Sequence, residues 1–462
     1  MRRASGEALA RSDPHVVICG AGIAGISAAY HLAVKCGMSG VILVDERAPL
    51  TLTSDKSTEC YRNWWPGPGD AMVGLMNRSI DLMEELAGES DNAFHMNRRG
   101  YLYATAEPAR IPWLRRTAEE SAVLGAGPVR CHPGRTPYRP APPQGYAGEP
   151  AGADLILDPA LIRWHFPYLS ERTLAVLHAR RCGWLSGQQL GMSLLERARE
   201  HGATFVSGHI EGIDVGHGRV RAVRLQGGDV IPADHFINAA GPFLKDVGSM
   251  LGVDLPVFTE LHGMAIFRDE RGVVPRDAPM LIWADPQVLS WSEEERSLLA
   301  HTEETEGFLR ELPSGAHLRP EGGPDSNILL MLWAYHTLPL APIWPPRFDP
   351  HFFEIVLRGL ATMLPGLQAY LDRAPRPVIG GGYYTKTREN RPLIGPLPVR
   401  GAYVIGALSG FGVMAACAAG ELLAAHLTGR ALPPYASAFL LERYRDPGYQ
   451  RLLETWHEIG QL

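Results

Sequence analysis

The stretch that decides the fold is Val16–Asp45, VVICGAGIAGISAAYHLAVKCGMSGVILVD. An apolar run, Val16–Cys19, leads into a glycine-rich turn, Gly20–Gly25, and a segment of small residues follows. A second apolar run, Val41–Val44, then ends at an acid, Asp45. Strand, tight turn, helix, strand and acid within about thirty residues predict a βαβ unit that binds a dinucleotide.

Each glycine of this turn has a physical reason. Gly20 allows the tight turn, Gly22 has no Cβ and lets a diphosphate approach the backbone, and Gly25 lets the helix pack close to the strand. The helix begins around Ile23 and Ala24, where its N–H groups and the positive end of its dipole face the phosphates. The alternative is a buried βαβ unit in which the glycines are coincidental.

The acid at the end of the second strand narrows the choice of cofactor. The Asp45 carboxylate can accept hydrogen bonds from a ribose diol, and it would repel a 2′-phosphate. NADP is therefore disfavoured, while NAD and FAD both remain open on this motif alone.

Composition and charge exclude several classes of protein. The chain has 462 residues, 45% of them hydrophobic, and its 44 basic and 50 acidic residues give a net charge of −6, so neither nucleic acid nor an anionic membrane is expected as a partner. The six cysteines form no CxxC pair, which argues against a zinc site or a disulfide framework. No apolar run is long enough to predict a membrane span. Residues 1–14 lack the apolar core of a secretory signal, so we expect a disordered leader and, by default, a cytoplasmic protein.

The middle of the chain predicts a second sheet. Residues 257–267 and 327–336 are apolar or aromatic with alternation, which is typical of strands. Between them, the charged stretch 291–312 is expected to be a solvated helix, and the periodicity of 351–364 predicts another helix. Residues 108–153 are rich in proline, glycine and arginine, and we expect them to be irregular.

The C-terminal third contains a second glycine turn. A predicted strand, Ala402–Ala407, is followed by the loop Ser409–Val413 and a helix, Met414–Leu427. This loop again places glycines at the N-terminus of a helix. Two glycine turns far apart in the chain predict a long cofactor held at both ends, which favours FAD over NAD.

Together, these motifs resemble the D-amino-acid oxidase, glycine oxidase, sarcosine oxidase and dimethylglycine dehydrogenase family of flavoproteins. The resemblance extends from Val16 to about Tyr444 and rests on these segments: Gly20–Gly25, Asp45, Ile237–Gly241, Tyr384–Thr385, Arg391–Gly395 and Ser409–Gly412. It implies an α/β (α+β) protein of two domains, a Rossmann-like FAD-binding domain and a substrate domain on an antiparallel sheet. The segments expected are a leader (1–14), the FAD-binding domain (15–104, 157–250 and 375–445), the substrate domain (105–156 and 251–374) and a tail (446–462).

The resemblance also implies which residues contact FAD. It places the diphosphate and flavin along the polar loop after Asp45, the adenine at a backbone group of Ile210, and the pyrimidine end of the flavin at the second glycine turn. A helix start at that end would stabilise reduced flavin. The full expected set is Gly20, Gly22, Ile23, Ala24, Gly25, Asp45, Glu46, Arg47, Ser54, Lys56, Ser57, Arg62, Ile210, Ala240, Gly241, Gly410, Phe411, Gly412, Val413 and Met414.

Three departures from the family pattern concern the flavin itself. Gly382 stands where sarcosine oxidases attach FAD through a cysteine, and Glu59 stands where dimethylglycine dehydrogenases attach it through a histidine. We therefore expect noncovalent FAD, with the neighbouring Cys60 as the remaining candidate for a covalent link. Leu332 replaces a lysine that promotes reaction with oxygen, and an apolar side chain cannot stabilise developing superoxide. This favours a dehydrogenase that passes electrons to another acceptor.

The substrate-binding pattern also departs from the family. Trp65 and Met414 replace the arginine and lysine that grip a substrate carboxylate, which favours a larger or more apolar amine; Arg62 or Arg388 could bind a carboxylate in another way. The resemblance places His336 and Tyr384 at the catalytic face. His336 would keep the amine deprotonated or orient it, although a buried structural role is an alternative for each of the two.

The predicted reaction is oxidation of a C–N bond of an amine or N-substituted amino acid, by hydride transfer to flavin N5. One alternative is oxidation of a 2-hydroxy acid or alcohol, with His336 or His262 as the base. A second is a flavin subunit that passes electrons to a partner within a hetero-oligomer. A third is a binding module without catalysis.

Overall fold

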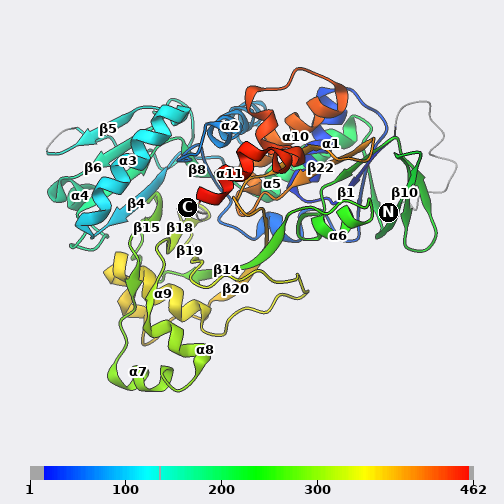
Figure 1. Cartoon of the computed structure of the whole chain (residues 1–462). Coiled ribbons are helices and arrows are strands. Elements are labelled where there is room, and N and C mark those ends of the chain that lie inside the picture. Colours follow the sequence, from blue (N-terminus) through cyan, green and yellow to red (C-terminus); the bar gives the residue numbers. More distant parts are fainter. Residues whose placement is uncertain (1–14, 135–136, 457–462) are drawn as a thin grey trace.

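The computed structural model describes residues 15–134 and 137–456, which build two main sheets (Figure 1). The first has six strands in the order β21-β22-β13-β1-β2-β9, all parallel except for the β21–β22 pair. Its strands are β1 (Val16–Cys19), β2 (Val41–Asp45), β9 (Thr204–Ser207), β13 (His235–Asn238), β21 (Leu393–Pro396) and β22 (Ala402–Gly406). This is the Rossmann-like sheet that the opening stretch predicts.

Both faces of the six-stranded sheet are covered. Side chains alternate along β1, so that Val16 and Ile18 join one core and Val17 joins another. The first core holds four helices: α1 (Ile23–Tyr30), α2 (Ala71–Glu89), α5 (Gly187–Glu200) and α10 (Gly412–Thr428). The second holds helix α6 (Leu244–Ser249) and a three-stranded sheet of β10 (Ile210–Gly216), β11 (Arg219–Leu225) and β12 (Val230–Pro232).

The second main sheet has nine strands in the order β20-β14-β19-β18-β15-β4-β7-β6-β5. It is antiparallel except for the pairs β15–β4 and β5–β6. Its strands are β4 (Tyr101–Thr105), β5 (Val129–His132), β6 (Ala153–Ile156), β7 (Ala175–Ala179), β14 (Phe258–Arg268), β15 (Met280–Trp283), β18 (His317–Glu321), β19 (Ile328–Leu332) and β20 (Val378–Lys386). The sequence predicts a second sheet, and this one is mainly antiparallel, as expected.

The nine-stranded sheet has two unlike faces. Leu329 and Met331 of β19 pack in the core that contains helix α9 (Phe352–Met363). Leu330 and Leu332, which alternate with them, belong instead to a small separate cluster with Met264. Around β14 and β19, helix α9 therefore packs on one face, whereas the other face lies toward the Thr53–Lys56 loop of the nucleotide domain.

The sheets divide the chain differently from the predicted domain segments. Strands β4, β7 and β20 fall inside the segments predicted for FAD binding, yet they pair within the nine-stranded sheet. Residues 108–153, expected to be irregular, contain helix α3 (Ile111–Ser121), whose Leu114 and Ala118 are buried. That helix packs in a core with β4 and β7. Local composition missed these contacts because they depend on pairing between distant strands.

The remaining elements are short. Helix α7 (Glu293–Leu299) begins with a Ser292–Glu295 capping box and buries none of its residues, which confirms the predicted solvated helix. The other short elements are α4 (Pro159–His165), α8 (Glu303–Glu306), α11 (Pro447–Thr455), and the strand pairs β3 (Cys60–Arg62) with β8 (Cys182–Trp184) and β16 (Gln287–Val288) with β17 (Glu311–Leu312). Among the helices of the described residues, none has the length and apolarity needed to span a bilayer.

Candidate active site

The first glycine turn is held by the acid that follows β2. Asp45 accepts a hydrogen bond from the backbone N–H of Ala21 (2.8 Å) and another from that of Arg47 (2.9 Å). Gly20 adopts a φ of +110°, and a Cβ on Gly25 would lie 2.0 Å from the Gly20 carbonyl oxygen. The close packing of helix α1 on β1 therefore requires glycine at both positions, as the motif predicts.

The polar loop after β2 lies over the start of α1. The Ser54 hydroxyl accepts a hydrogen bond from the Ile23 N–H at 3.0 Å, and the Thr53 hydroxyl donates to the carbonyl of Tyr383 at 2.9 Å. The loop is thus anchored both to the nucleotide domain and to strand β20.

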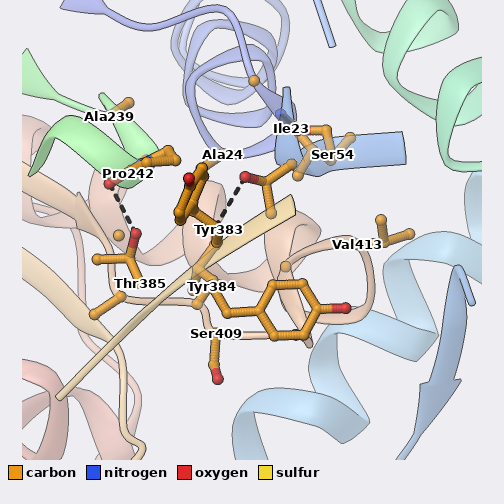
Figure 2. Close-up of a pocket in the computed structure, with 18 of the residues that line it drawn as sticks. Ile23, Ala24, Ser54, Ala239, Pro242, Tyr383, Tyr384, Thr385, Ser409 and Val413 are labelled. Carbon is orange, nitrogen blue, oxygen red and sulfur yellow. Dashed lines mark hydrogen bonds between the residues drawn. The ribbon is translucent and has the colours of Figure 1, made fainter. Parts of the chain in front are cut away.

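The second glycine turn reaches the same place from the other end of the chain. The Ser409 N–H donates to the Thr385 carbonyl (2.9 Å), and the Thr385 hydroxyl donates to the Gly241 carbonyl (3.0 Å; Figure 2). Helix α10 begins at Gly412, so its N-terminus faces the region lined by these residues. Strand β20 is the element that brings the turn and the nucleotide domain together.

Two adjoining cavities form one trough between these elements. One end is lined by Asp45 and Ile210, and the other by the second glycine turn and Tyr384. Figure 2 shows Tyr384 and Val413 reaching this second end from two different elements. The residues shared by both cavities are Gly22, Thr53, Ser54, Ala239, Gly241 and Pro242. The two glycine turns that the sequence singles out therefore line a single continuous site.

Most of the residues expected from the sequence line this trough. They are Gly20, Gly22, Ile23, Ala24, Asp45, Glu46, Arg47, Ser54, Ser57, Ile210, Ala240, Gly241, Tyr384, Gly410, Gly412 and Val413. Six others do not line the two cavities within the described chain: Gly25, Lys56, Arg62, His336, Phe411 and Met414.

The positions of these six explain the difference. Lys56 forms an ion pair with Asp55 (2.7 Å), and Met414 is buried in the core of the nucleotide domain. Arg62 is buried; its guanidinium stacks over the Trp65 ring and donates to the Tyr103 hydroxyl. Gly25 acts through helix packing, and Phe411 meets the edge of the same Trp65 ring.

His336, the predicted catalytic histidine, lies in an exposed loop after β19. Another histidine, His262 of β14, is buried and stacks on Tyr384, with ring centroids 4.1 Å apart and planes 16° apart. Its Nε2 lies 3.1 Å from Oε2 of Glu260, and the Lys386 ammonium donates to that same oxygen at 3.3 Å. These four residues, His262, Tyr384, Glu260 and Lys386, form what we call the polar cluster.

Strand register builds the polar cluster. In the antiparallel β14–β20 pair, Glu260 lies opposite Tyr384, His262 opposite Gly382 and Phe258 opposite Lys386. Residues two apart on a strand share a face, so the four side chains gather on one face of this pair. The chain thus places a cation, a carboxylate and an imidazole beside the flavin end of the trough.

Electrostatics favour an ionised carboxylate at the centre of the cluster. Burial alone would raise the pKa of Glu260, but the hydrogen bond from His262 and the charge of Lys386 outweigh it and hold that pKa below its ordinary value. Burial raises the pKa of the Tyr384 phenol, which is therefore neutral. Burial also lowers the pKa of the neighbouring His317 to about 4, so that this ring carries no charge near neutral pH.

Sequence reasoning missed Glu260 and Lys386 and named His262 only as a base for an alternative reaction. The one available signal was the spacing of Glu260 and His262, which puts both side chains on one face of a predicted strand. Lys386 gave no such signal, because it lies 126 residues from Glu260 and meets it only through the sheet register.

Glu59, which stands at the family's histidine position, forms a second, half-buried carboxyl site. It accepts a hydrogen bond from the Gly187 N–H (3.0 Å) at the start of α5. A Cβ on Gly187 would lie 2.8 Å from Glu59 and 3.2 Å from Val413, so this carboxyl sits behind the flavin end of the trough. Burial raises the pKa of Glu59 to about 7, although the charge of Arg319 lowers it.

The trough fits a flavin dinucleotide. Its far end offers a carboxylate for a ribose diol, its middle is lined by the glycine cradle and the first residues of α1, and its near end lies at the N-terminus of α10. A Cβ on Gly22 would lie 3.2 Å from the Ser54 hydroxyl oxygen and would narrow this cradle. Fold and site together define a dinucleotide-binding oxidoreductase with a second domain over the reactive end.

The family follows from comparison with known proteins. Residues 15–426 match the model of the FAD dependent oxidoreductase family, and the chain belongs to that family. The chain is 24% identical over 424 residues to the mitochondrial dimethylglycine dehydrogenase of Mus musculus, a match that covers 88% of this chain and 41% of that protein. It is 23% identical over 439 residues to the Homo sapiens protein of the same name, covering 91% and 43%. The chain thus spans about two-fifths of the length of these relatives.

Solved structures share the fold. L-proline dehydrogenase from P. horikoshii matches with a TM-score of 0.71 at 19% identity, covering 94% of this chain and 98% of that one. Iminodiacetate oxidase from Chelativorans sp. BNC1 matches with a TM-score of 0.68 at 20% identity, covering 92% and 98%. Glycine oxidase from Geobacillus kaustophilus matches with a TM-score of 0.70 at 16% identity, covering 93% of this chain and 98% of that one. The predictions of the family, of its α/β fold and of FAD as cofactor are therefore confirmed.

Proposed function

We propose that this chain oxidises a C–N bond of an amine or N-substituted amino acid and transfers a hydride from the adjacent carbon to FAD. The observation that carries the proposal is the polar cluster at the flavin end of the trough, where His262 stacks on Tyr384. Relatives named dimethylglycine dehydrogenase and iminodiacetate oxidase support this class of substrate.

Bound FAD supplies the hydride acceptor, and the protein supplies orientation and proton control. Because a carboxylate only accepts, His262 Nε2 carries the hydrogen that points to Glu260, and Nδ1 is the accepting nitrogen of the neutral ring. His262 can then take a proton from the substrate ammonium, since only a neutral amine readily gives up hydride. Lys386 donates to the same Glu260 oxygen and balances part of its charge.

We also propose that the reduced flavin passes its electrons to an acceptor other than oxygen. Leu332 is buried in the apolar cluster with Met264 and Leu330, on the sheet face that is turned toward the nucleotide domain. An apolar wall favours a dehydrogenase that passes its electrons to a separate acceptor, because it does not stabilise superoxide. Noncovalent attachment of FAD is also proposed, since Gly382 and Glu59 offer no group for the usual covalent link.

The test is anaerobic reduction of the FAD-loaded protein by a panel of amines and 2-hydroxy acids. The panel contains dimethylglycine, iminodiacetate, proline, glycine and lactate, and the flavin's visible absorbance reports reduction. We expect bleaching by at least one N-substituted amino acid, with release of an aldehyde or an imine hydrolysis product. Bleaching by lactate alone would replace the proposal with alcohol oxidation. Oxygen consumption at the rate of anaerobic reduction would contradict the separate acceptor.

A further inference from the structure

The long connection between β19 and α9 lies against the nucleotide domain. Residues 337–348, TLPLAPIWPPRF, contain no helix and only one isolated bridge, between Pro339 and Glu260; we call this segment the strap. It extends alongside β14 and β20 (Figure 1). Ordered connections of this length within a domain usually have a function of their own.

The first half of the strap is anchored to the edge of the nine-stranded sheet. The Leu340 N–H donates to the Thr259 carbonyl at 2.9 Å, and the Thr259 hydroxyl donates to the Leu340 carbonyl. Toward its end, Phe348 lies against Gly381, where a Cβ would come within 2.7 Å of the phenyl ring. The glycine run of β20 thus lets the strap lie close on one side, while the Thr53–Lys56 loop meets Gly382 on the other.

Tyr383 links the strap to the cofactor trough. Its hydroxyl accepts from the Ile343 N–H (3.0 Å) and donates to the Ile343 carbonyl (3.1 Å), while its ring lines the flavin-end cavity. Trp344 meets the same ring edge to face, with centroids 5.3 Å apart. Any movement of the strap therefore acts directly on a wall of the trough.

Trp344 also reaches across to the nucleotide domain. The Arg47 guanidinium lies 5.9 Å from the Trp344 ring centroid, and Arg47 lines the nucleotide end of the trough. The indole N–H of Trp344 is buried and finds no acceptor in the described part of the chain. A buried donor of this kind is commonly satisfied by an ordered water or a ligand oxygen. The strap thus extends from the nine-stranded sheet to the nucleotide end of the trough.

Few contacts hold the strap in place. Leu338, Leu340 and Ile343 are 59%, 40% and 48% exposed, so their apolar side chains do not anchor the strap in a core. The contacts found in the described chain are backbone hydrogen bonds, the hydroxyls of Thr259 and Tyr383, and the rings of Trp344 and Phe348. Segments with so little buried apolar surface open at low free-energy cost.

We propose that the strap is a clasp over the cofactor trough, closed by Trp344 and Tyr383, and that its opening limits both the entry and the release of FAD. The clasp acts on the cofactor and not on the substrate. It can therefore be tested without turnover, and its failure is separate from failure of the proposed reaction.

The experiment measures FAD association and dissociation for the full chain and three variants. Flavin fluorescence reports release after dilution, and its quenching reports binding. For Trp344→Ala we expect both rate constants to rise about tenfold, because the cation–π and ring contacts of the closed strap are lost. For Tyr383→Phe, which keeps the ring but loses both bonds to Ile343, we expect a rise of several-fold. Leu338→Ala, a truncation of an exposed strap residue, should match wild type.

The association and dissociation rate constants together distinguish a clasp from a simple contact to FAD. A gate changes entry and release alike, whereas the loss of a simple contact to FAD changes release alone, so a change confined to dissociation overturns the clasp. Wild-type rates in both Trp344→Ala and Tyr383→Phe also overturn it. Thermal unfolding of the FAD-free variants, expected to match wild type, shows that altered rates do not arise from a damaged fold.

Discussion

The two ends of the trough are built on different principles. The nucleotide end is built mainly from backbone within residues 16–54. The Ala21 and Ile23 N–H groups are bonded to Asp45 and Ser54, and the glycine cradle and the Asp45 carboxylate line the end itself. At the flavin end, side chains of β14 and β20 meet, and a carboxylate, an ammonium and an imidazole are held by strand register. Glycine substitutions at the first end should therefore act through steric clash, and substitutions in the polar cluster through charge and proton position.

The largest effect is expected where the backbone is most crowded. Gly25→Ala places a Cβ 2.0 Å from the Gly20 carbonyl oxygen, so α1 must move away from β1. We expect the free energy of unfolding to fall by about 3 kcal/mol and FAD binding to be lost. Denaturant unfolding and FAD titration measure both. Gly380→Ala, where a Cβ would meet nothing within 4 Å, should cost no more than about 0.5 kcal/mol.

At the flavin end the sharpest comparison is between two histidines. His262→Asn removes the imidazole next to Tyr384, and we expect anaerobic flavin reduction to slow about 100-fold, the size of a lost general base, with FAD affinity unchanged. His336→Asn, in the exposed loop, should change the rate less than twofold. The prediction that His336 is catalytic would be restored if the two effects were reversed.

The same contrast shows what the sequence could predict. The turn at Gly20–Gly25 and the acid Asp45 were predictable because their geometry is local and only glycine allows it. The second glycine turn was predictable because a glycine-rich loop stands directly before a helix, and two such turns indicate a long cofactor.

Contacts between distant strands could not be predicted from the local sequence pattern. Nothing near Lys386 indicates that Glu260 is its partner, and the spacing of Glu260 and His262 defines a shared face without saying what lies opposite. The sequence predicts a strand that runs through His336, but β19 ends at Leu332, so the chain has left the sheet before the histidine. Strand ends and register, rather than composition, decide which polar residues reach the flavin.

A smaller effect is expected for the acid of the nucleotide end. Asp45→Asn keeps an acceptor for the Ala21 N–H but removes the charge and one acceptor oxygen for the ribose diol. We expect FAD affinity to fall about tenfold, with the unfolding free energy of the FAD-free protein changed by less than about 1 kcal/mol. Glu211→Gln, which removes an exposed carboxylate of β10 that lines neither cavity, is the control and should lower affinity less than threefold. Equal losses in both variants would mean that net charge, and not the diol contact, sets the affinity.

The smallest effect is expected for Glu59, which lies behind the flavin end. Its burial should make the stability of the fold depend on pH. Burial raises its folded pKa from 4.5 to about 7, against the charge of Arg319 and with Glu321 and Asp55 nearby. The folded state therefore holds the proton more tightly than the unfolded state, so stability falls as pH rises from about 4.5 to 7 and is level above that. Glu59→Gln should leave stability unchanged near pH 4 and raise it by about 1 kcal/mol at pH 8, after allowance for solvent screening. Thermal unfolding across this range, with the exposed Glu303→Gln as a pH-independent control, tests the sign; a gain at acid pH instead would show that this carboxyl is ionised and stabilising in the fold.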